Sequence, residues 1–125
     1  THIKQEEVDN GLNLSDALKE LDKFLILNNV QSWSSWGYFD KNKIISETYS
    51  KKIDMSQSFL LSLPHSNLSL IVKDYRRINK KCGVRKTMNS LGLKFEGEQH
   101  RAIYDTINMA RIVNKINERE IVIKI

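Results

Sequence analysis

The sequence predicts an α/β domain in which several helices surround few strands. Apolar residues recur at helical spacing near both ends of the chain, over residues 14–27 and 101–116. Residues 30–36 are rich in Val, Ser and Trp and precede Gly37, which is typical of a strand that ends in a turn. A length of 125 residues with 40% hydrophobic composition suits one domain with a single modest core. Because so apolar a strand needs backbone partners, we expect further strands upstream of Thr1.

Caps and breakers in the sequence predict the remaining elements. Asn13 or Ser15 is available to cap the helix over residues 14–27. Asp40 stands near the start of a helix predicted over residues 39–49, where a carboxylate suits the positive end of the helix dipole. Pro64 interrupts the chain before the next helix. The other predicted elements are a helix over 68–78, a helix over 84–91 closed by Gly92, a helix from 101 with Ile103, Ile107, Ala110 and Val113 on one side, and a strand-like tail over 120–125.

Composition excludes several classes of protein. Cys82 is the only cysteine, so neither an intramolecular disulfide nor a cysteine-rich zinc site can form, and a reducing compartment, the cytoplasm, is expected. The apolar runs fall far short of the roughly 20 residues that a membrane helix needs. The chain begins at Thr1, without a Met or a signal peptide, so we expect residues upstream. The net charge of +5 favours contact with a polyanion without identifying one.

Three side chains suit the hydrolysis of a phosphodiester. Asp40 follows a strand and turn, His100 directly precedes a helix, and Asp105 lies in the first turn of that helix. Carboxylates hold divalent metal ions, which stabilise charge on the phosphorus oxygens and lower the pKa of the attacking water. An imidazole titrates near neutral pH and can act as the general base. Taken singly, the two aspartates could instead serve the helix dipole, and the histidine could be structural.

Four segments of the chain follow, in order, the pattern of one known family. THIKQEEVDNG at the start is similar to "ltgItqeqVd.G", and WSSWGYFD, residues 33–40, to "SWG.FD". Asn67 and Leu68 match an "NLK" helix opening, with Ser69 in place of lysine. LGLKFEGEQHRAIYDTINMA, residues 91–110, is similar to "l.l.feG.hH.giDDarNiA". Together they resemble the DEDDh exonucleases, in particular the branch of the histone-mRNA and RNA-interference-regulating exonucleases and the bacterial sporulation inhibitor.

The resemblance covers Thr1 to about Val113, so residues 1–117 are assigned to the later part of one exonuclease domain and 118–125 to a tail. It implies a ribonuclease H-like fold, with a mixed central sheet flanked by helices and its first strands missing from this chain. It also implies hydrolysis of single-stranded RNA or DNA from the 3′ end to nucleoside monophosphates, with Mg²⁺ or Mn²⁺. In that reaction Asp105 would hold metal directly, Asp40 would act through metal-bound water, and His100 would be the general base.

The chain departs from the family pattern in two respects. Ala102 and Tyr104 replace a customary glycine and a customary acidic residue beside His100. The first family motif, an aspartate and a glutamate separated by one residue, has no counterpart in the chain. We therefore expect the chain alone to bind the metal pair weakly and to have little activity.

Other interpretations of the sequence stay open beside the nuclease. A truncated exonuclease fold would bind nucleic acid or a protein without cutting, and a small helical DNA-binding protein would use residues 80–91. Trp33 and Trp36 either stack on bases or pack in the core. His2, His65 and His100 lack the spacing of zinc ligands. One basic cluster either contacts a nucleic-acid backbone or faces solvent, namely Arg76, Arg77, Lys80, Lys81, Arg85 and Lys86.

Overall fold

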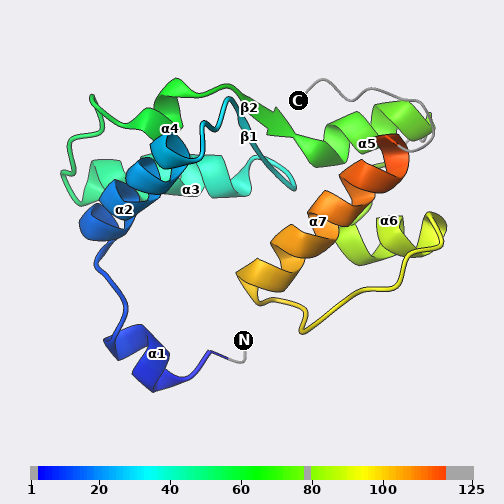
Figure 1. Ribbon diagram of the computed structural model, residues 1–125, viewed down its shortest axis with the longest axis horizontal. Coiled ribbons are helices and arrows are strands. Elements are labelled where there is room, and N and C mark those ends of the chain that lie inside the picture. The colour runs from blue at the N-terminus through cyan, green and yellow to red at the C-terminus, as the bar shows by residue number, and fades with distance from the viewer. Residues whose placement is uncertain (1–2, 78–79, 118–125) are drawn as a thin grey trace. The chain divides into compact units, whose positions relative to one another are not determined.

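A computed structural model of the chain describes residues 3–77 and 80–117. These residues form a small α/β protein with seven helices and a two-stranded sheet (Figure 1). In chain order the elements are α1 (Gln5–Asp9), α2 (Leu14–Leu27), β1 (Trp33–Ser35), α3 (Phe39–Ser50), α4 (Phe59–Ser62), β2 (His65–Asn67), α5 (Leu68–Arg76), α6 (Val84–Ser90) and α7 (Ala102–Asn117). The predicted α/β class is confirmed.

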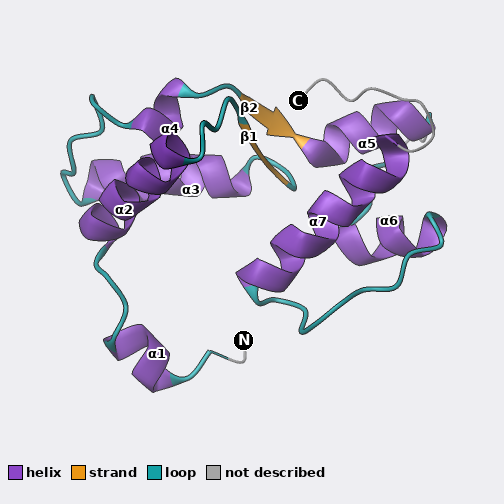
Figure 2. Ribbon diagram, in the orientation of Figure 1, coloured by secondary structure: helices purple, strands orange, loops and turns teal. Residues whose placement is uncertain are grey.

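The sheet pairs β1 with β2 in parallel (Figure 2). In this pairing Trp33 lies opposite His65. The crossover between the strands contains α3 and α4, because parallel strands cannot be joined by a tight hairpin. The strand predicted over residues 30–36 is shorter in the structure, where β1 pairs only over the three residues that β2 offers. The resemblance predicts a mixed sheet, whereas the strands among the described residues are parallel.

The chain divides into two compact units. Unit 1 contains the described residues 3–8 and 69–117, and unit 2 contains residues 9–68. Each unit buries apolar side chains of its own.

The core of unit 2 forms between α2 and α4. Leu18, Leu25 and Leu60 are buried there, and Trp33 packs against them, which confirms a core position for this tryptophan. The N-terminus of α2 is capped as predicted, because Asn13 Oδ1 accepts a 2.9 Å hydrogen bond from the Asp16 amide. At the other end of α2 the amides of Asn29 and Val30 donate back to the carbonyls of Ile26 and Leu25, while Asn29 adopts a φ of 54°.

Unit 1 buries the apolar side chains Val72, Met88, Leu91, Ile112 and Ile116, and α6 contacts α7. The helix predicted from residue 101 is confirmed, and Ile116, which lies close to the predicted apolar stripe, is fully buried. The stripe itself is not the buried face. Ile103 and Ile107 are 62% and 39% exposed, whereas Asn108 is fully buried beside Ile112 on the next face. The buried face of α7 is decided by what packs against it, namely α6 and the loop that precedes α7. The periodicity of the sequence does not reveal which face this is.

Other sequence predictions differ from the structure at the ends of elements. The helices predicted over 39–49 and 84–91 correspond to α3 and α6, while α5 ends at Arg76 rather than at residue 78. The short elements α1, α4 and β2 were not predicted. The predicted tail over 120–125 lies outside the described residues. Within the described ranges, no helix combines the length and apolarity needed to cross a membrane.

Candidate functional site

Asp40 is positioned by a strand, a turn and a helix in unit 2. β1 ends at Ser35, Gly37 turns the chain with a φ of 101°, and α3 begins at Phe39. The turn is held from both sides, because Gly37 donates to Asn67 Oδ1 at 3.1 Å and Ser35 Oγ donates to the Gly37 carbonyl at 2.8 Å. An exposed Asp40 follows in the first turn of α3, where the helix dipole favours a carboxylate.

His65 lies beneath the same turn and was not predicted as part of the site. Its ring contacts Trp33 and Tyr38, with centroid separations of 4.4 and 5.9 Å. Burial lowers the pKa of His65, the charge of Lys41 lowers it further, and the charge of Asp40 opposes both. Sequence patterns do not reveal this residue, because β2 has only three residues and follows Pro64.

His100 and Asp105 are carried by the N-terminal end of α7 in unit 1. His100 is exposed and adopts a φ of 70° in the loop just before the helix. Asp105 is half-buried in the first turn, and its amide donates to the Arg101 carbonyl at 3.1 Å. A positive φ is uncommon for a residue other than glycine, although histidine adopts it more often than most.

Side chains of α7 hold the loop that carries His100. Asn108 pairs with both backbone groups of Glu96, accepting from its amide at 3.0 Å and donating to its carbonyl at 2.8 Å. Arg111 donates to the carbonyl of Lys94 at 2.6 Å. Gly97 has a φ of 77° and lies so close to the Tyr104 ring that a side chain there would collide with it. Tyr104, a departure from the family pattern, thus packs directly on the loop before His100.

Arg101 ties the start of α7 to α1 within unit 1. Its Nη2 lies 2.7 Å from Glu7 Oε1. A hydrogen bond from the Lys4 amide and the contact with Arg101 both lower the pKa of Glu7. The segment predicted to match the family start is thereby joined to the loop region of His100.

The predicted site residues are thus divided between the units, with Asp40 in unit 2 and His100 and Asp105 in unit 1. As carboxylates, Asp40 and Asp105 fit Mg²⁺ or Mn²⁺ in chemical kind. In number they fall short, because the described part of the chain gathers no group of three or more His, Cys, Asp or Glu side chains that could hold a metal ion. A cavity of about 160 Å³ in unit 2 is lined by Leu18, Asp22 and Met55 among others and by none of the predicted site residues.

The candidate residues therefore lie in two separate local arrangements. One is the turn between β1 and α3 with Asp40, and the other is the loop 94–100 held on α7 with His100 and Asp105. The chain matches no protein-family model, no curated protein and no solved structure.

Proposed function

We propose that the chain is part of a metal-dependent 3′-5′ exonuclease of ribonuclease H-like fold, which hydrolyses single-stranded RNA or DNA to nucleoside monophosphates in a reducing compartment such as the cytoplasm. The observation that carries this proposal is the placement of His100 and Asp105 at one helix end, with Asp105 in the first turn of α7 and His100 on the preceding loop, which Asn108 holds. The strand–turn–helix that presents Asp40 supports it independently. Both arrangements have the local form that the sequence resemblance implies.

Each residue has a defined part in the proposed reaction. Water attacks the phosphorus of the terminal nucleotide, the bond from phosphorus to the preceding 3′ oxygen breaks, and His100 accepts the proton of the water. Bound Mg²⁺ or Mn²⁺ supplies stabilisation of the charge that develops on the phosphorus oxygens. Asp105 would hold that ion directly and Asp40 would position water bound to it. The exposed position of His100 allows a 3′ end to approach it.

The second candidate is a module of the same fold that binds nucleic acid or protein without cutting. The observation that favours it is the small number of acidic side chains gathered in the described residues. A chain that lacks a complete ligand set would keep its binding surface and lose turnover.

The deciding experiment is Mn²⁺-dependent digestion of 3′-labelled single-stranded RNA and DNA by the full chain. The His100→Ala variant is compared with Gln99→Ala, an exposed neighbour on the same loop. The enzyme proposal expects the parent and Gln99→Ala to release the label, slowly because the chain lacks the first acidic motif of the family, and His100→Ala to lose this turnover while substrate binding changes little. Silence of the parent chain with both substrates would overturn the enzyme proposal for this chain and leave the binding module.

A further inference from the structure

The positive charge of the chain belongs to unit 1. Residues 9–68, which form unit 2, contain six Lys and Arg against seven Asp and Glu. The rest of the chain contains fourteen Lys and Arg against eight Asp and Glu. The net charge of +5 of the whole chain therefore comes from unit 1. This charge favours contact between unit 1 and a polyanion.

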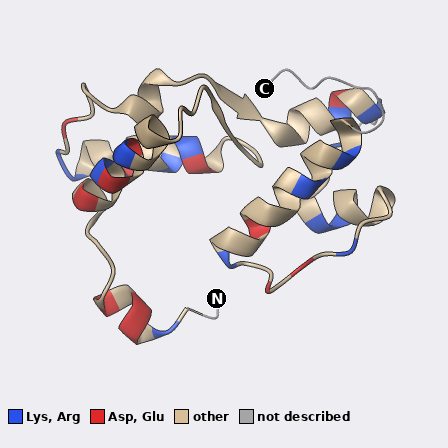
Figure 3. Ribbon diagram, in the orientation of Figure 1, with Lys and Arg blue, Asp and Glu red and all other residues tan. Residues whose placement is uncertain are grey.

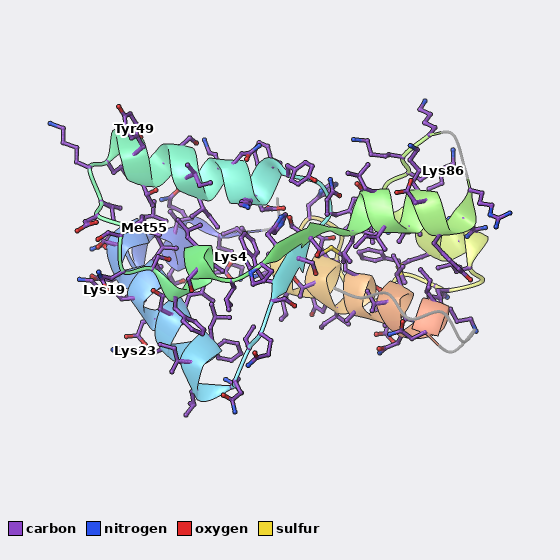
Figure 4. All side chains as sticks on the ribbon, turned by 90° about the horizontal axis from the view of Figure 1, so that it is seen from above. Lys4, Lys19, Lys23, Tyr49, Met55 and Lys86 are labelled. Carbon is purple, nitrogen blue, oxygen red and sulfur yellow. The ribbon has the colours of Figure 1, made fainter. Side chains whose placement is uncertain are left out.

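Within unit 1 the charge is concentrated around α5 and α6 (Figure 3). Residues 73–86 include Asp74 as their only acidic residue. The Arg76 guanidinium donates to Ser90 Oγ, which links the end of α5 to the end of α6. We define the basic surface by five exposed residues, Arg77, Lys80, Lys81, Arg85 and Lys86, the last of which belongs to α6 and is labelled in Figure 4.

Within the described ranges, acidic side chains do not pair with the charges of the basic surface. In unit 2, Lys23 pairs with Glu20 at 2.9 Å and Lys43 pairs with Glu47 at 2.8 Å. No residue of the basic surface forms an ion pair with another residue of the described ranges. These five cations lie close together in the sequence and lack ion pairs among the described residues, so an external anion is favoured there.

The surface suits a nucleic-acid backbone better than a membrane. Membrane-bound helices place exposed apolar side chains beside their lysines. Among the described residues from 69 to 90, the large apolar side chains Val72 and Met88 are buried and none is exposed. The Arg85 guanidinium lies 4.9 Å from the centre of the Phe95 ring, which holds it as a planar group of the kind on which bases stack.

We propose that the basic surface of α5 and α6 binds the phosphate backbone of single-stranded nucleic acid. This inference rests on the proposed function, because it names the part of the chain that holds the same substrate outside the site of hydrolysis. Each phosphate that is neutralised releases a counterion, so the logarithm of affinity falls with the logarithm of salt concentration by about 0.7 per contact on a single strand. Binding is therefore strongly weakened by salt and requires no divalent metal.

The test is fluorescence anisotropy of a labelled single-stranded oligonucleotide with the full chain in EDTA, over a series of salt concentrations. The variant Lys80→Gln/Lys81→Gln/Lys86→Gln removes three charges of the basic surface. The matched control Lys19→Gln/Lys23→Gln/Lys52→Gln removes three exposed charges of unit 2; Lys19 and Lys23 are labelled on α2 in Figure 4. We expect the first variant to bind about tenfold or more weakly, with a salt slope smaller by about 2, and the control to bind like the parent.

A second readout locates the bound strand. Cys82 is the only cysteine and lies between Lys81 and Arg85 in the sequence, so bound oligonucleotide should slow its alkylation by a maleimide. Equal losses of affinity in both triple variants, or unchanged alkylation of Cys82, would overturn the inference. So would binding to phosphatidylserine vesicles without binding to the oligonucleotide.

Failure of this inference is distinguishable from failure of the nuclease proposal. In EDTA no metal-dependent hydrolysis occurs, so the anisotropy reports binding alone. If the Lys80/Lys81/Lys86 substitutions weaken binding of the oligonucleotide and the digestion assay shows no release of label, the role of the basic surface is supported and the enzyme proposal is overturned. If digestion occurs and is unaffected by the Lys80/Lys81/Lys86 substitutions, only the proposal that the basic surface binds nucleic acid is overturned.

Discussion

Ser35 Oγ lies 2.8 Å from His65 Nε2 and joins the two strands of the sheet through their side chains. The single hydroxyl hydrogen of Ser35 is donated to the Gly37 carbonyl, so the imidazole donates to Ser35 through Nε2. This bonding leaves His65 Nδ1 as the unprotonated nitrogen, and it is buried without a hydrogen-bond partner in the described residues. Protonation of His65 would therefore place a charge inside the turn that leads to Asp40.

We predict that the chain loses stability as the pH falls from about 7 to about 5. The pKa of His65 in the folded chain is lowered from its ordinary value of 6.5, so in this range the unfolded chain binds a proton that the folded chain does not. The free energy of unfolding, measured by urea denaturation, should therefore decrease with falling pH. Carboxylates with a lowered pKa, such as Glu47, lower the free energy of unfolding mainly as the pH falls below the ordinary glutamate pKa of 4.5.

The variant His65→Gln tests the assignment of this pH dependence. It removes the titrating ring, so its free energy of unfolding should vary less between these two pH values than that of the parent. A parent-like slope in the variant would show that another group is responsible.

Asp22 stabilises α4 from a distant part of the sequence. Its two carboxylate oxygens accept from the amides of Phe59 at 3.1 Å and Leu60 at 2.9 Å, which would otherwise be unpaired at the start of a four-residue helix. We predict that Asp22→Ala lowers the free energy of unfolding by about 1–3 kcal/mol. Glu20→Ala is the control, because its exposed ion pair with Lys23 should contribute less than about 1 kcal/mol. Equal losses in the two variants would contradict the capping role.

Asn108 should be needed for the geometry of the loop that carries His100. It is fully buried and bonds to the amide and carbonyl of Glu96, so Asn108→Ala leaves these backbone groups without their partner. We predict a loss of about 1–3 kcal/mol in the free energy of unfolding and faster hydrogen exchange of the Glu96 amide. Asn114→Ala changes an exposed asparagine of the same helix and should have little effect on either measurement. Unchanged exchange at Glu96 in Asn108→Ala would show that the loop is held by other contacts.

Local sequence signals were sufficient for the longer helices. The apolar spacing and the Asn13 cap predict α2, and the position of Asp40 after a turn predicts the start of α3. Gly92, which ends the helix predicted over 84–91, adopts a φ of 73° in the structure. These features depend on residues within a few positions of one another, so they can be read from the sequence.

Two of the missed elements, α4 and β2, depend on residues far apart in the chain. α4 has four residues; Ser58 caps it locally, and its first two amides donate to the distant Asp22. β2 has three residues and pairs with β1. Elements of this length leave no periodic pattern. The fit of His65 beneath the turn after β1 likewise appears only when the two strands are placed side by side.

The sequence by itself determined the α/β class, the longer helices and the candidate residues Asp40, His100 and Asp105, because spacing and motif are local properties. Only the tertiary structure decided that Asn108 rather than Ile103 or Ile107 is buried on α7, since burial depends on what packs against a helix. It also decided the division of the chain into two units, because that division follows contacts between residues distant in sequence.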